Sequence, residues 1–278
     1  MSYLEEKTLE AIEILREYEP SGGYYLAFSG GKDSIVCYNL LVKSGCKFDA
    51  HYNVTTIDLP DILVYMKSNY PDVIWDYPLY KGKPTSFYKL IETHGLPARQ
   101  MKFCCEILKE YGGFGRFQID GLRSAESHRR SLRSKLESVF DKKNRKKFEG
   151  VELTLEELDA HVSSGIAKKA LHIIFDWSDN LVWNYINTNE IEYCKLYDMG
   201  FHRIGCIGCP NQNANTKEHE FQMYPRMKQA IIRAIKKRMA SGKHFAYYDT
   251  AEDVFNWWVS GDSVRRNKGK KSQLLLDL

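Results

Sequence analysis

Six residues at positions 29–34, SGGKDS, combine the backbone and side-chain types that bind phosphate. The two glycines allow a tight turn and a close approach of the backbone to a ligand, Lys32 supplies a cation, and both serines offer hydroxyl donors. An apolar run of strand character precedes the motif and a run with helical spacing follows it, so backbone N–H groups and the helix dipole converge on one point. We therefore expect a phosphate-binding loop formed by Ser29, Gly30, Gly31, Lys32, Asp33 and Ser34.

Two common nucleotide-binding loops do not match this motif. A Walker A loop needs a glycine five positions before its Gly-Lys pair and a Ser or Thr directly after the lysine, where this chain has Leu26 and Asp33. The dinucleotide fingerprint spaces its glycines, whereas Gly30 and Gly31 are adjacent. The loop thus belongs to neither class.

Four cysteines form a second candidate site. They occur as an adjacent pair and as a distant C-x-x-C, at Cys104, Cys105, Cys206 and Cys209. Four thiolates are a full ligand set for a [4Fe–4S] cluster or a structural Zn²⁺. Neighbouring cysteines suit the separate iron corners of a cluster better than one zinc ion, so a cluster is preferred. Zinc, supported by the flanking His202 and His219, and a redox dithiol or uncoordinated thiols remain alternatives.

A charged element, IDGLRSAESHRRS (119–131), follows a run of strand character. Arg123, Arg129 and Arg130 could bind phosphate or sulfate bidentately. Glu126 could orient one arginine or contact Mg²⁺. Because ligands bind beyond the carboxyl ends of parallel strands, this element is expected to face the same site as SGGKDS.

The elements that must position these residues alternate between strand and helix. Strand patterns cover 24–28, 48–56, 72–78, 117–122 and 171–177, and helical patterns cover 33–45, 59–70, 87–96, 103–112, 179–189 and 218–239, the last possibly bent at Pro225. This alternation predicts an α/β fold with a doubly wound, mostly parallel sheet and flanking helices. We expect one nucleotide-binding domain over 1–200, with a charged insertion at about 132–169, and a cysteine-knuckle and helical region over 201–278 packed on it.

Composition limits the class of protein. The chain has 278 residues, 43% of them hydrophobic and 27% charged, as in folded soluble proteins. It has no long apolar segment, its first twenty residues do not read as a signal peptide, and seven cysteines suit no disulfide framework, so we expect a cytoplasmic location and no membrane partner. The net charge of +4 is mild, but basic runs lie at 142–147 and 265–271. A solvated loop and a tail are the simpler interpretation, and nucleic-acid binding is the alternative.

The SGGKDS loop resembles that of the PP-loop superfamily, which includes the N-type ATP pyrophosphatases and the sulfonucleotide reductases. The resemblance implies an adenine nucleotide as ligand. In many members ATP is cleaved between its α- and β-phosphates, which adenylates an acceptor and releases pyrophosphate. By resemblance, Asp33 and the loop would position pyrophosphate and its Mg²⁺.

Three further features narrow the resemblance to the phosphoadenylylsulfate (PAPS) reductase-like family and its iron–sulfur branch. They are the two cysteine pairs, the 119–131 element, which is similar to G-[IV]-R-x-x-E-S-x-x-R, and the run from 173 to 210. The resemblance implies that Lys32, Asp33, Arg123, Glu126 and Arg130 serve catalysis, that Gly121 and Ser127 join the loop in binding the nucleotide, and that the four cysteines hold a [4Fe–4S] cluster.

One departure shifts the expected reaction. Sulfonucleotide reductases attack with a cysteine in a C-terminal tail, and no cysteine follows Cys209 here. The remaining features resemble the ATP pyrophosphatases of DNA phosphorothioation (the DndC and SspD type). We therefore expect an ATP pyrophosphatase acting in sulfur transfer, with a cysteine desulfurase and nucleic acid, DNA or tRNA, as partners. Adenylylsulfate or PAPS reduction, and a non-catalytic ATP-binding subunit, are the alternatives.

Overall fold

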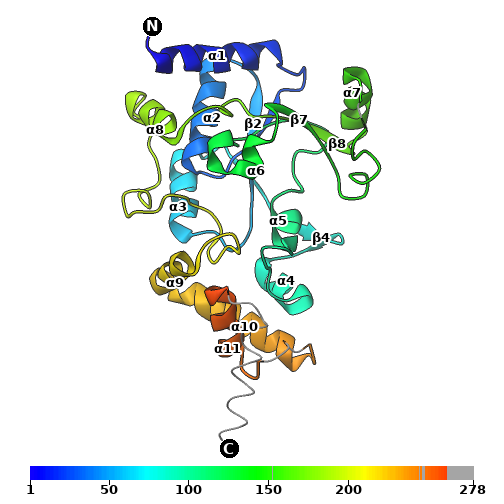
Figure 1. Ribbon diagram of the computed structural model, residues 1–278, viewed down its shortest axis with the longest axis vertical. Helices are drawn as coiled ribbons and strands as arrows, with labels where there is room; N and C mark the ends of the chain where they lie inside the picture. The colour runs from blue at the N-terminus through cyan, green and yellow to red at the C-terminus, as the bar shows by residue number, and fades with distance from the viewer. Residues whose placement is uncertain (152, 244, 246–247, 262–278) are drawn as a thin grey trace, which may run out of the picture. The chain divides into compact units, whose positions relative to one another are not determined.

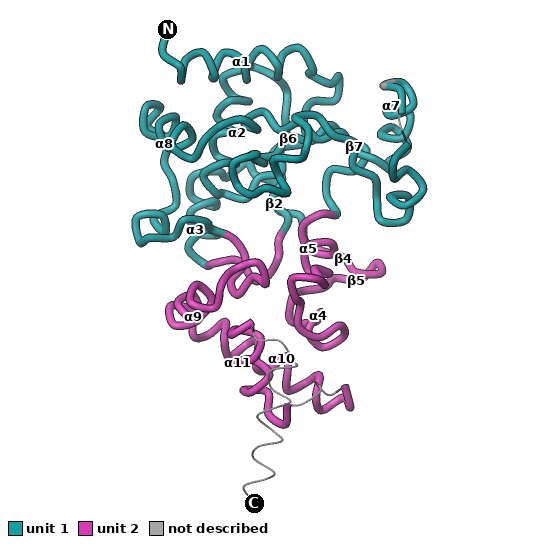
Figure 2. Tube along the Cα trace, in the orientation of Figure 1, with its two compact units in different colours: residues 1–53, 60–76, 111–204 teal, residues 54–59, 77–110, 205–278 magenta. Residues whose placement is uncertain are grey.

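The computed structural model describes residues 1–151, 153–243, 245 and 248–261. The chain forms two compact units, each built from separate stretches of sequence (Figure 1 and Figure 2). The first unit comprises residues 1–53, 60–76 and 111–204, and the second comprises 54–59, 77–110 and 205–278. The basic run at 265–271 lies outside the described residues.

The first unit holds the sheet and the helices around it. Its elements in chain order are α1 (Tyr3–Glu17), β1 (Tyr24–Ala27), α2 (Lys32–Ser44), β2 (Phe48–Asn53), α3 (Pro60–Asn69), β3 (Ile74–Asp76), β6 (Phe117–Ile119), the short η1 (Ser124–Glu126), α6 (His128–Ser131), β7 (Leu136–Phe140), α7 (Leu155–Ser163), β8 (Ala167–Leu171) and α8 (Asp179–Thr188). Local signals set several of these ends. Ser2 and Glu5 form a capping box that starts α1, and Gly45, in the left-handed region, ends α2.

The six strands form one sheet in the order β3-β2-β1-β6-β8-β7. All neighbours pair in parallel except β7, which pairs antiparallel with β8 at the end of the sheet. The predicted fold class, a mostly parallel α/β sheet with flanking helices, is confirmed. The direction of winding reverses between β1 and β6, and in sheets of this kind the ligand site lies beyond the carboxyl ends of the strands at that reversal.

Apolar residues of the central strands form the core of the first unit. Tyr24 and Leu26 on β1 and Ile119 on β6 are fully buried. Helices α1, α2 and α8 contact one another in one layer, and α2 also contacts β1. Burial of these side chains, at roughly 25 cal/mol per Å² of apolar surface, fixes where β1 ends and α2 begins. It therefore also fixes the position of the SGGKDS loop.

The expected insertion contains part of the sheet, which differs from the expectation of a separate excursion. Strands β7 and β8 both fall within 132–171, and the core strand is 167–171 rather than 171–177. The charged sequence concealed β8 because two of its residues are lysines. Lys168 is buried with its Nζ 2.8 Å from both Gly112 O and Gln118 Oε1, and Lys169 lies over the Phe117 ring.

The second unit is mostly helical. It contains β4 (Leu79–Tyr80), β5 (Lys83–Pro84), α4 (Phe87–His94), α5 (Phe103–Leu108), α9 (Ala214–Met223), α10 (Pro225–Ala240) and α11 (Ala251–Ser260). Helix α10 packs against α4, α9 and α11. The predicted helix at 218–239 is two helices, because Tyr224 leaves helical geometry and Pro225 starts α10.

The division of the chain differs from the expected boundary near residue 200. Residues 54–59 and 77–110 join the C-terminal region rather than the nucleotide-binding domain. The reason is visible in two contacts within the second unit: α4 packs against α10, and Asp58 forms a β-bridge with Cys206.

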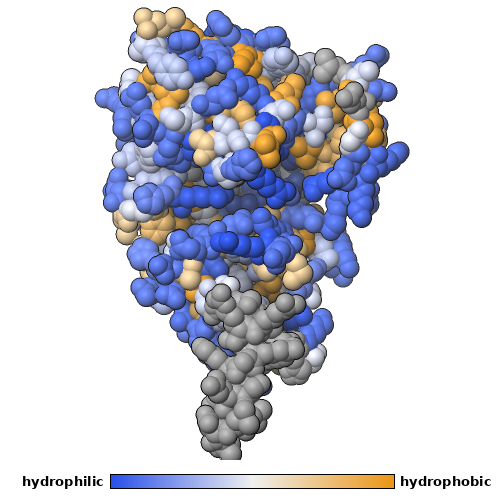
Figure 3. Space-filling model, viewed as in Figure 1, coloured by the Kyte–Doolittle hydropathy of each residue, from blue (hydrophilic) through white to orange (hydrophobic). Residues whose placement is uncertain are grey.

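None of the helices in the described residues combines the length and apolar character that a membrane span requires. The face drawn in Figure 3 is mostly hydrophilic, with apolar side chains in patches among hydrophilic ones. Scattered apolar residues of this kind are ordinary on protein surfaces.

Candidate functional site

The SGGKDS loop leaves the carboxyl end of β1 and enters α2 directly. Gly30 has a φ of +70°, a region that side-chain-bearing residues rarely adopt, and Gly31 is the N-cap of α2. The buried Ser34 hydroxyl donates to Gly31 O (2.9 Å) and accepts from Ser29 N–H (3.2 Å). Ser34 therefore stabilises the turn from inside, while Ser29 is exposed.

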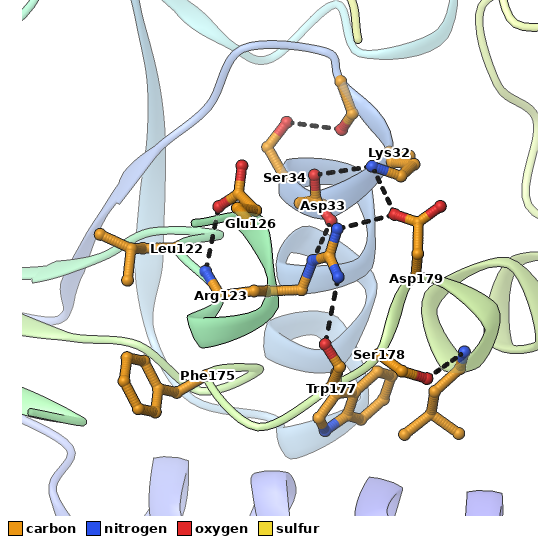
Figure 4. A network of polar contacts seen from close by, with 12 residues as sticks. Lys32, Asp33, Ser34, Leu122, Arg123, Glu126, Phe175, Trp177, Ser178 and Asp179 are labelled. Atoms are coloured by element: carbon orange, nitrogen blue, oxygen red, sulfur yellow. Dashed lines mark hydrogen bonds and ion pairs between the residues drawn. The ribbon is translucent and has the colours of Figure 1, made fainter. Parts of the chain in front are cut away.

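Four charged side chains form a closed network beside this loop (Figure 4). Arg123, only 3% exposed, donates from Nε to Asp33 (2.7 Å) and from Nη2 to Asp179 (2.8 Å). Lys32 Nζ lies 3.3 Å from Asp33 Oδ2 and 3.1 Å from Asp179 Oδ1. Two cations thus alternate with two carboxylates. The remaining Arg123 nitrogen, Nη1, donates to Trp177 O (3.1 Å).

This network gives Arg123 and Lys32 different surroundings. All three Arg123 guanidinium nitrogens have protein acceptors, so its side chain fixes Asp33 and Asp179. The Lys32 ammonium contacts only carboxylates among the described residues, and it lies at the start of α2, where an anion is favoured. Of the two cations, Lys32 is therefore the one that could exchange its carboxylate partners for a phosphate.

Asp179 is a site residue that the sequence analysis did not identify. It is the first residue of α8, directly after the N-cap Ser178, and its side chain is 59% exposed. Partial burial acts to raise its pKa, but the Lys32 hydrogen bond and charge and the Arg123 charge lower it below the usual value. The sequence did contain a signal for Asp179, because it is an acidic residue at the start of a predicted helix. That helix directly follows a predicted strand, and ligands bind at the carboxyl edge of such a sheet.

The 119–131 element brings its residues to the same edge. A Cβ on Gly121 would lie 2.9 Å from Asp33 Cβ, so glycine permits this segment to pass against the loop. Glu126 accepts from Arg123 N–H (3.2 Å) and forms an ion pair with Arg130. Ser127 caps α6 by accepting from Arg130 N–H (3.3 Å). Burial and the charge of Arg203 lower the pKa of Arg130, and Arg129 is exposed.

A second residue that the sequence analysis did not single out is Tyr197. Its hydroxyl accepts a hydrogen bond from Lys32 N–H (2.9 Å), at the start of α2. Its ring packs edge-on against Trp183 of α8. The Leu-Tyr-Asp segment matches a family pattern, but a pattern does not predict that Tyr197 contacts Lys32, which lies 165 residues away in the sequence.

The four candidate ligand cysteines all belong to the second unit, and none of the seven cysteines, all of them within the described residues, forms a disulfide. Cys104 and Cys105 share a hydrogen bond, which raises the pKa of Cys104 and lowers that of Cys105 to about 6. The charges of Cys206 and Cys209 also act on Cys104. Burial raises the pKa of Cys206 to about 11, and Asp58 Oδ1 lies 3.9 Å from its sulfur.

The C-x-x-C turn is held by residues outside the motif. Gly208 has a φ of +64°, and a Cβ there would lie 2.6 Å from Phe221 and 2.8 Å from Trp258. The Gly208 N–H donates to the buried carboxylate of Glu220 (2.8 Å). Glu220 lies twelve residues further along, on α9, and burial raises its pKa. Sequence reasoning missed it because a glutamate on a charged helix carries no sign of burial.

Across the described part of the chain, no group of three or more His, Cys, Asp or Glu side chains is arranged to hold a metal ion. Assignment of the four cysteines as ligands stays a prediction. Their chemistry fits an iron–sulfur cluster, since four free thiols lie in one unit and those of both pairs interact electrostatically. The outlying cysteines Cys37, Cys46 and Cys194 are buried, as expected for small apolar residues.

Comparison with known proteins gives relatives of two kinds. An uncharacterized protein of Methanocaldococcus jannaschii is 30% identical over 74% of this chain and 46% of its own length, and a second from that organism is 28% identical over 66% and 35%. The chain thus spans less than half the length of these relatives. The adenosine 5'-phosphosulfate reductase of Neisseria meningitidis serogroup B is 47% identical over 58 residues, which are 21% of this chain and 22% of that enzyme.

A solved structure and a family model also match this chain. The crystal structure of phosphoadenylyl-sulfate reductase from Candida auris, a phosphate complex, is 18% identical with a TM-score of 0.46, and the match covers 74% of this chain and 96% of that one. The model of the phosphoadenosine phosphosulfate reductase domain matches residues 23–212, which include both candidate loops and all four paired cysteines. The chain therefore belongs to the phosphoadenosine phosphosulfate reductase domain family.

Proposed function

We propose that this chain is an ATP pyrophosphatase that adenylates an acceptor for sulfur transfer. The observation that carries the proposal is the network of Lys32, Asp33, Arg123 and Asp179 at the start of α2, beyond the carboxyl end of β1 at the winding reversal. Such a position suits an anion, and the loop supplies a helix start, a buried cation and glycine-shaped backbone.

In the proposed reaction an acceptor oxygen attacks the α-phosphorus of ATP. The bond from this phosphorus to the oxygen that bridges to the β-phosphorus breaks, pyrophosphate leaves, and the acceptor carries AMP, a better leaving group that a sulfur nucleophile then displaces. A cysteine desulfurase would supply that sulfur as a persulfide, and a dithiol reductant would then cleave the resulting disulfide to release the thiolated acceptor. The protein's part is to place charges: Lys32 would move from its carboxylates to the phosphates, and Asp33, oriented by Arg123, would bind Mg²⁺. Glu126 and Arg130 would flank the nucleotide from the second loop.

Cys104, Cys105, Cys206 and Cys209 would hold a [4Fe–4S] cluster in the second unit, with Zn²⁺ as the alternative. When bound, a cluster would supply redox-active iron and sulfide close to the C-x-x-C turn. Glu220 and Gly208 would keep the shape of that turn. Anaerobic ultraviolet–visible spectra with iron, sulfide and zinc analysis test this assignment. One zinc ion per chain without sulfide would mean that the four cysteines bind Zn²⁺ instead of a cluster.

Nucleic acid is the proposed acceptor because of a basic turn in the first unit. Five of the six residues at 142–147 are Lys or Arg, and all five are exposed. The turn has a defined shape: Asp141 Oδ1 accepts from Asn144 N–H (2.9 Å), and Phe140 and Phe148 stack at its two ends (4.3 Å between centroids). A fixed cluster of cations suits a phosphate backbone.

The main test is ATP turnover by the full chain with Mg²⁺, a cysteine desulfurase and DNA or tRNA. AMP and pyrophosphate should form, and Lys32→Met should abolish their formation because the phosphates lose their cation. Lys67→Met, an exposed lysine on α3, is the control and should turn over normally. Absence of both products with every acceptor would rule the proposal out.

The acceptor is tested separately by the salt dependence of nucleic-acid binding. Changing Lys142, Lys143, Lys146 and Lys147 to Gln should reduce the slope of log K against log salt by up to about 3–4 for duplex DNA. The same number of changes at the exposed Lys83, Lys89, Lys236 and Lys237 should leave the slope unchanged. Equal slopes for both sets would remove the basic turn from the proposal.

Reduction of adenylylsulfate or PAPS is the second candidate, favoured by the 47% identical segment shared with a Neisseria reductase. Adenylation is preferred over reduction because residues 210–278 contain no cysteine. Sulfite and the corresponding adenosine phosphate, formed with a thioredoxin dithiol as the electron donor, would establish reduction instead.

A further inference from the structure

Tyr197 is held rigidly against the SGGKDS loop. It lies in a helical turn in which its N–H donates to Cys194 O (3.1 Å) and its carbonyl accepts from Gly200 N–H (3.1 Å). Cys194 and Leu196 of the same turn are buried. The Tyr197 ring stands edge-on to Trp183, with 5.0 Å between centroids and an interplanar angle of 86°. The phenol therefore has one defined position in the first unit.

The Tyr197 hydroxyl contacts the backbone of the loop. Its oxygen accepts from Lys32 N–H at 2.9 Å and would lie 3.5 Å from a Cβ on Gly31. Accepting this bond uses one lone pair and leaves the hydroxyl proton to be donated. Among the described residues no acceptor is found for that proton. A hydroxyl donor without an acceptor, next to Lys32, indicates that an anion could accept its hydrogen bond.

Electrostatics keep this proton on the phenol. Burial raises the pKa of Tyr197 well above its usual value, and the nearby charges of Asp33 and Asp179 raise it further. The hydroxyl is thus a neutral donor throughout the physiological pH range. It can add a hydrogen bond to a phosphate without adding a charge to a network that is already balanced.

We infer that Tyr197 is a ligand of the nucleotide's phosphate, anchored by the Lys32 N–H and donating its own proton to a phosphate oxygen. This inference rests on the proposed binding of an adenine nucleotide at SGGKDS and adds a contact from the 194–200 turn to it. Tyr197 binds substrate here rather than reacting with it. A competing explanation is that the phenol oxygen occupies the position on the Lys32 N–H that a phosphate oxygen would take. A bound nucleotide would then have to displace the phenol.

The two explanations predict opposite effects of Tyr197→Phe on binding of pyrophosphate and of ATP with Mg²⁺. Loss of a hydrogen bond to a charged group should weaken binding about tenfold. A displaced stand-in would give equal or tighter binding, which would overturn the inference. Phenylalanine keeps the ring, so the packing on Trp183 is retained. Calorimetry gives the affinities, and quenching of Trp183, identified by comparison with Trp183→Phe, locates the event.

Tyr193→Phe is the matched control. Tyr193 lies in the adjoining segment and also packs edge-on against Trp183 (5.2 Å), but its hydroxyl donates to Asp198 Oδ1 (3.0 Å) instead of facing the loop. Its loss should leave pyrophosphate affinity unchanged. Equal weakening by both variants would mean that the aromatic cluster, rather than the Tyr197 hydroxyl, matters, and would also overturn the inference.

A measurement on the unmutated chain avoids any folding defect of the variant. In protein labelled with 3-fluorotyrosine, the ¹⁹F resonance of Tyr197 should shift on addition of pyrophosphate, while that of Tyr193 should not. If the unmutated protein binds neither pyrophosphate nor ATP, the proposed function fails and the inference fails with it. If it binds both while the Tyr197 resonance and the Tyr197→Phe affinity stay unchanged, only the inference fails.

Discussion

The phosphate-type loop at 29–34 and the cysteine turn at 206–209 are built alike in backbone and differently in charge. Each turns at a glycine in the left-handed region, and each glycine is pressed by apolar side chains: Gly30 by Met66 and Ile62, Gly208 by Phe221 and Trp258. Around the first loop, however, cations and carboxylates alternate in a closed network. The cysteine turn instead depends on one buried carboxylate, Glu220.

This difference separates two ways of preparing a site. In the first loop, Gly30 and Ser34 hold the turn, and Lys32 and Asp33 of the same six-residue motif carry the charge. In the second, Glu220 and Gly208 fix the shape while the sulfur atoms stay available. Substitutions at Glu220 and Gly208 can therefore test the shape of the cysteine turn without removing a sulfur atom.

The largest expected effect follows from breaking the charge network. Arg123→Met leaves Asp33 and Asp179 without their buried partner, with only Lys32 to compensate, and should cost about 3–4 kcal/mol of unfolding free energy. Denaturant unfolding measures this. Arg133→Met, which breaks an ion pair with Glu137 at a more exposed place, should cost under about 1 kcal/mol. Similar costs for the two would show that the network adds nothing to an ordinary surface pair.

The two glycines allow a direct comparison of the turns. Gly208→Ala should cost about 3 kcal/mol, because backbone strain adds to a clash with two rigid aromatic rings. Gly30→Ala should cost about 2 kcal/mol, since the flexible Met66 side chain can move.

Gly242→Ala and Gly45→Ala are the controls for the two glycine variants. Both positions have positive φ and no neighbour within 4 Å of an added Cβ, so each should cost only the strain of about 1–2 kcal/mol. Thermal unfolding of all four variants gives the order, and a larger loss at Gly30 than at Gly208 would reverse the comparison.

A smaller effect distinguishes the two turns by pH. Burial raises the pKa of Glu220, so its contribution to stability is present below the unfolded value of 4.5 and is lost as the pH rises through the folded pKa. Glu220→Gln keeps an acceptor for Gly208 N–H and should remove this loss. Stability profiles from pH 4 to 8 should therefore diverge with rising pH, and parallel profiles would contradict the assignment.

The smallest effect is expected at Asp179. Its lowered pKa means that its stabilising contribution is present above 3.8 and is lost as the pH falls through the folded pKa. Because the side chain is 59% exposed, Asp179→Asn should cost under about 1 kcal/mol at neutral pH. The variant should also lose less stability than the parent on acidification, which acid titration followed by circular dichroism can measure.

Much of the first unit could be predicted from periodicity. The strand at 24–28 and the helix at 33–45 are bounded by glycines and differ by one residue or so from β1 and α2. Strand β8 could not be predicted because its pattern places Lys168 in the interior, where a hydrogen bond to Gly112 compensates its charge. Local sequence does not reveal such compensation, since the partner lies 56 residues away.

The site divides in the same way. Lys32 and Asp33 were identified because their motif is contiguous, and the structure places Arg123 beside them. Tyr197 and Glu220 were missed because each acts through a contact made only after folding. Arg123 shows the reverse case, since the sequence identified the residue and folding changed its expected partner from phosphate to two carboxylates.

Because the seven cysteines are unequally buried, thiol labelling can count how many of them a metal or cluster binds. Cys37, Cys46 and Cys194 are at most 7% exposed, whereas the other four are partly open to solvent. An alkylating mass tag should therefore add four labels to the folded apoprotein and seven to the unfolded chain. When a metal or cluster is bound, each cysteine that ligates it should be protected from the tag. The decrease from four labels would then equal the number of cysteine ligands.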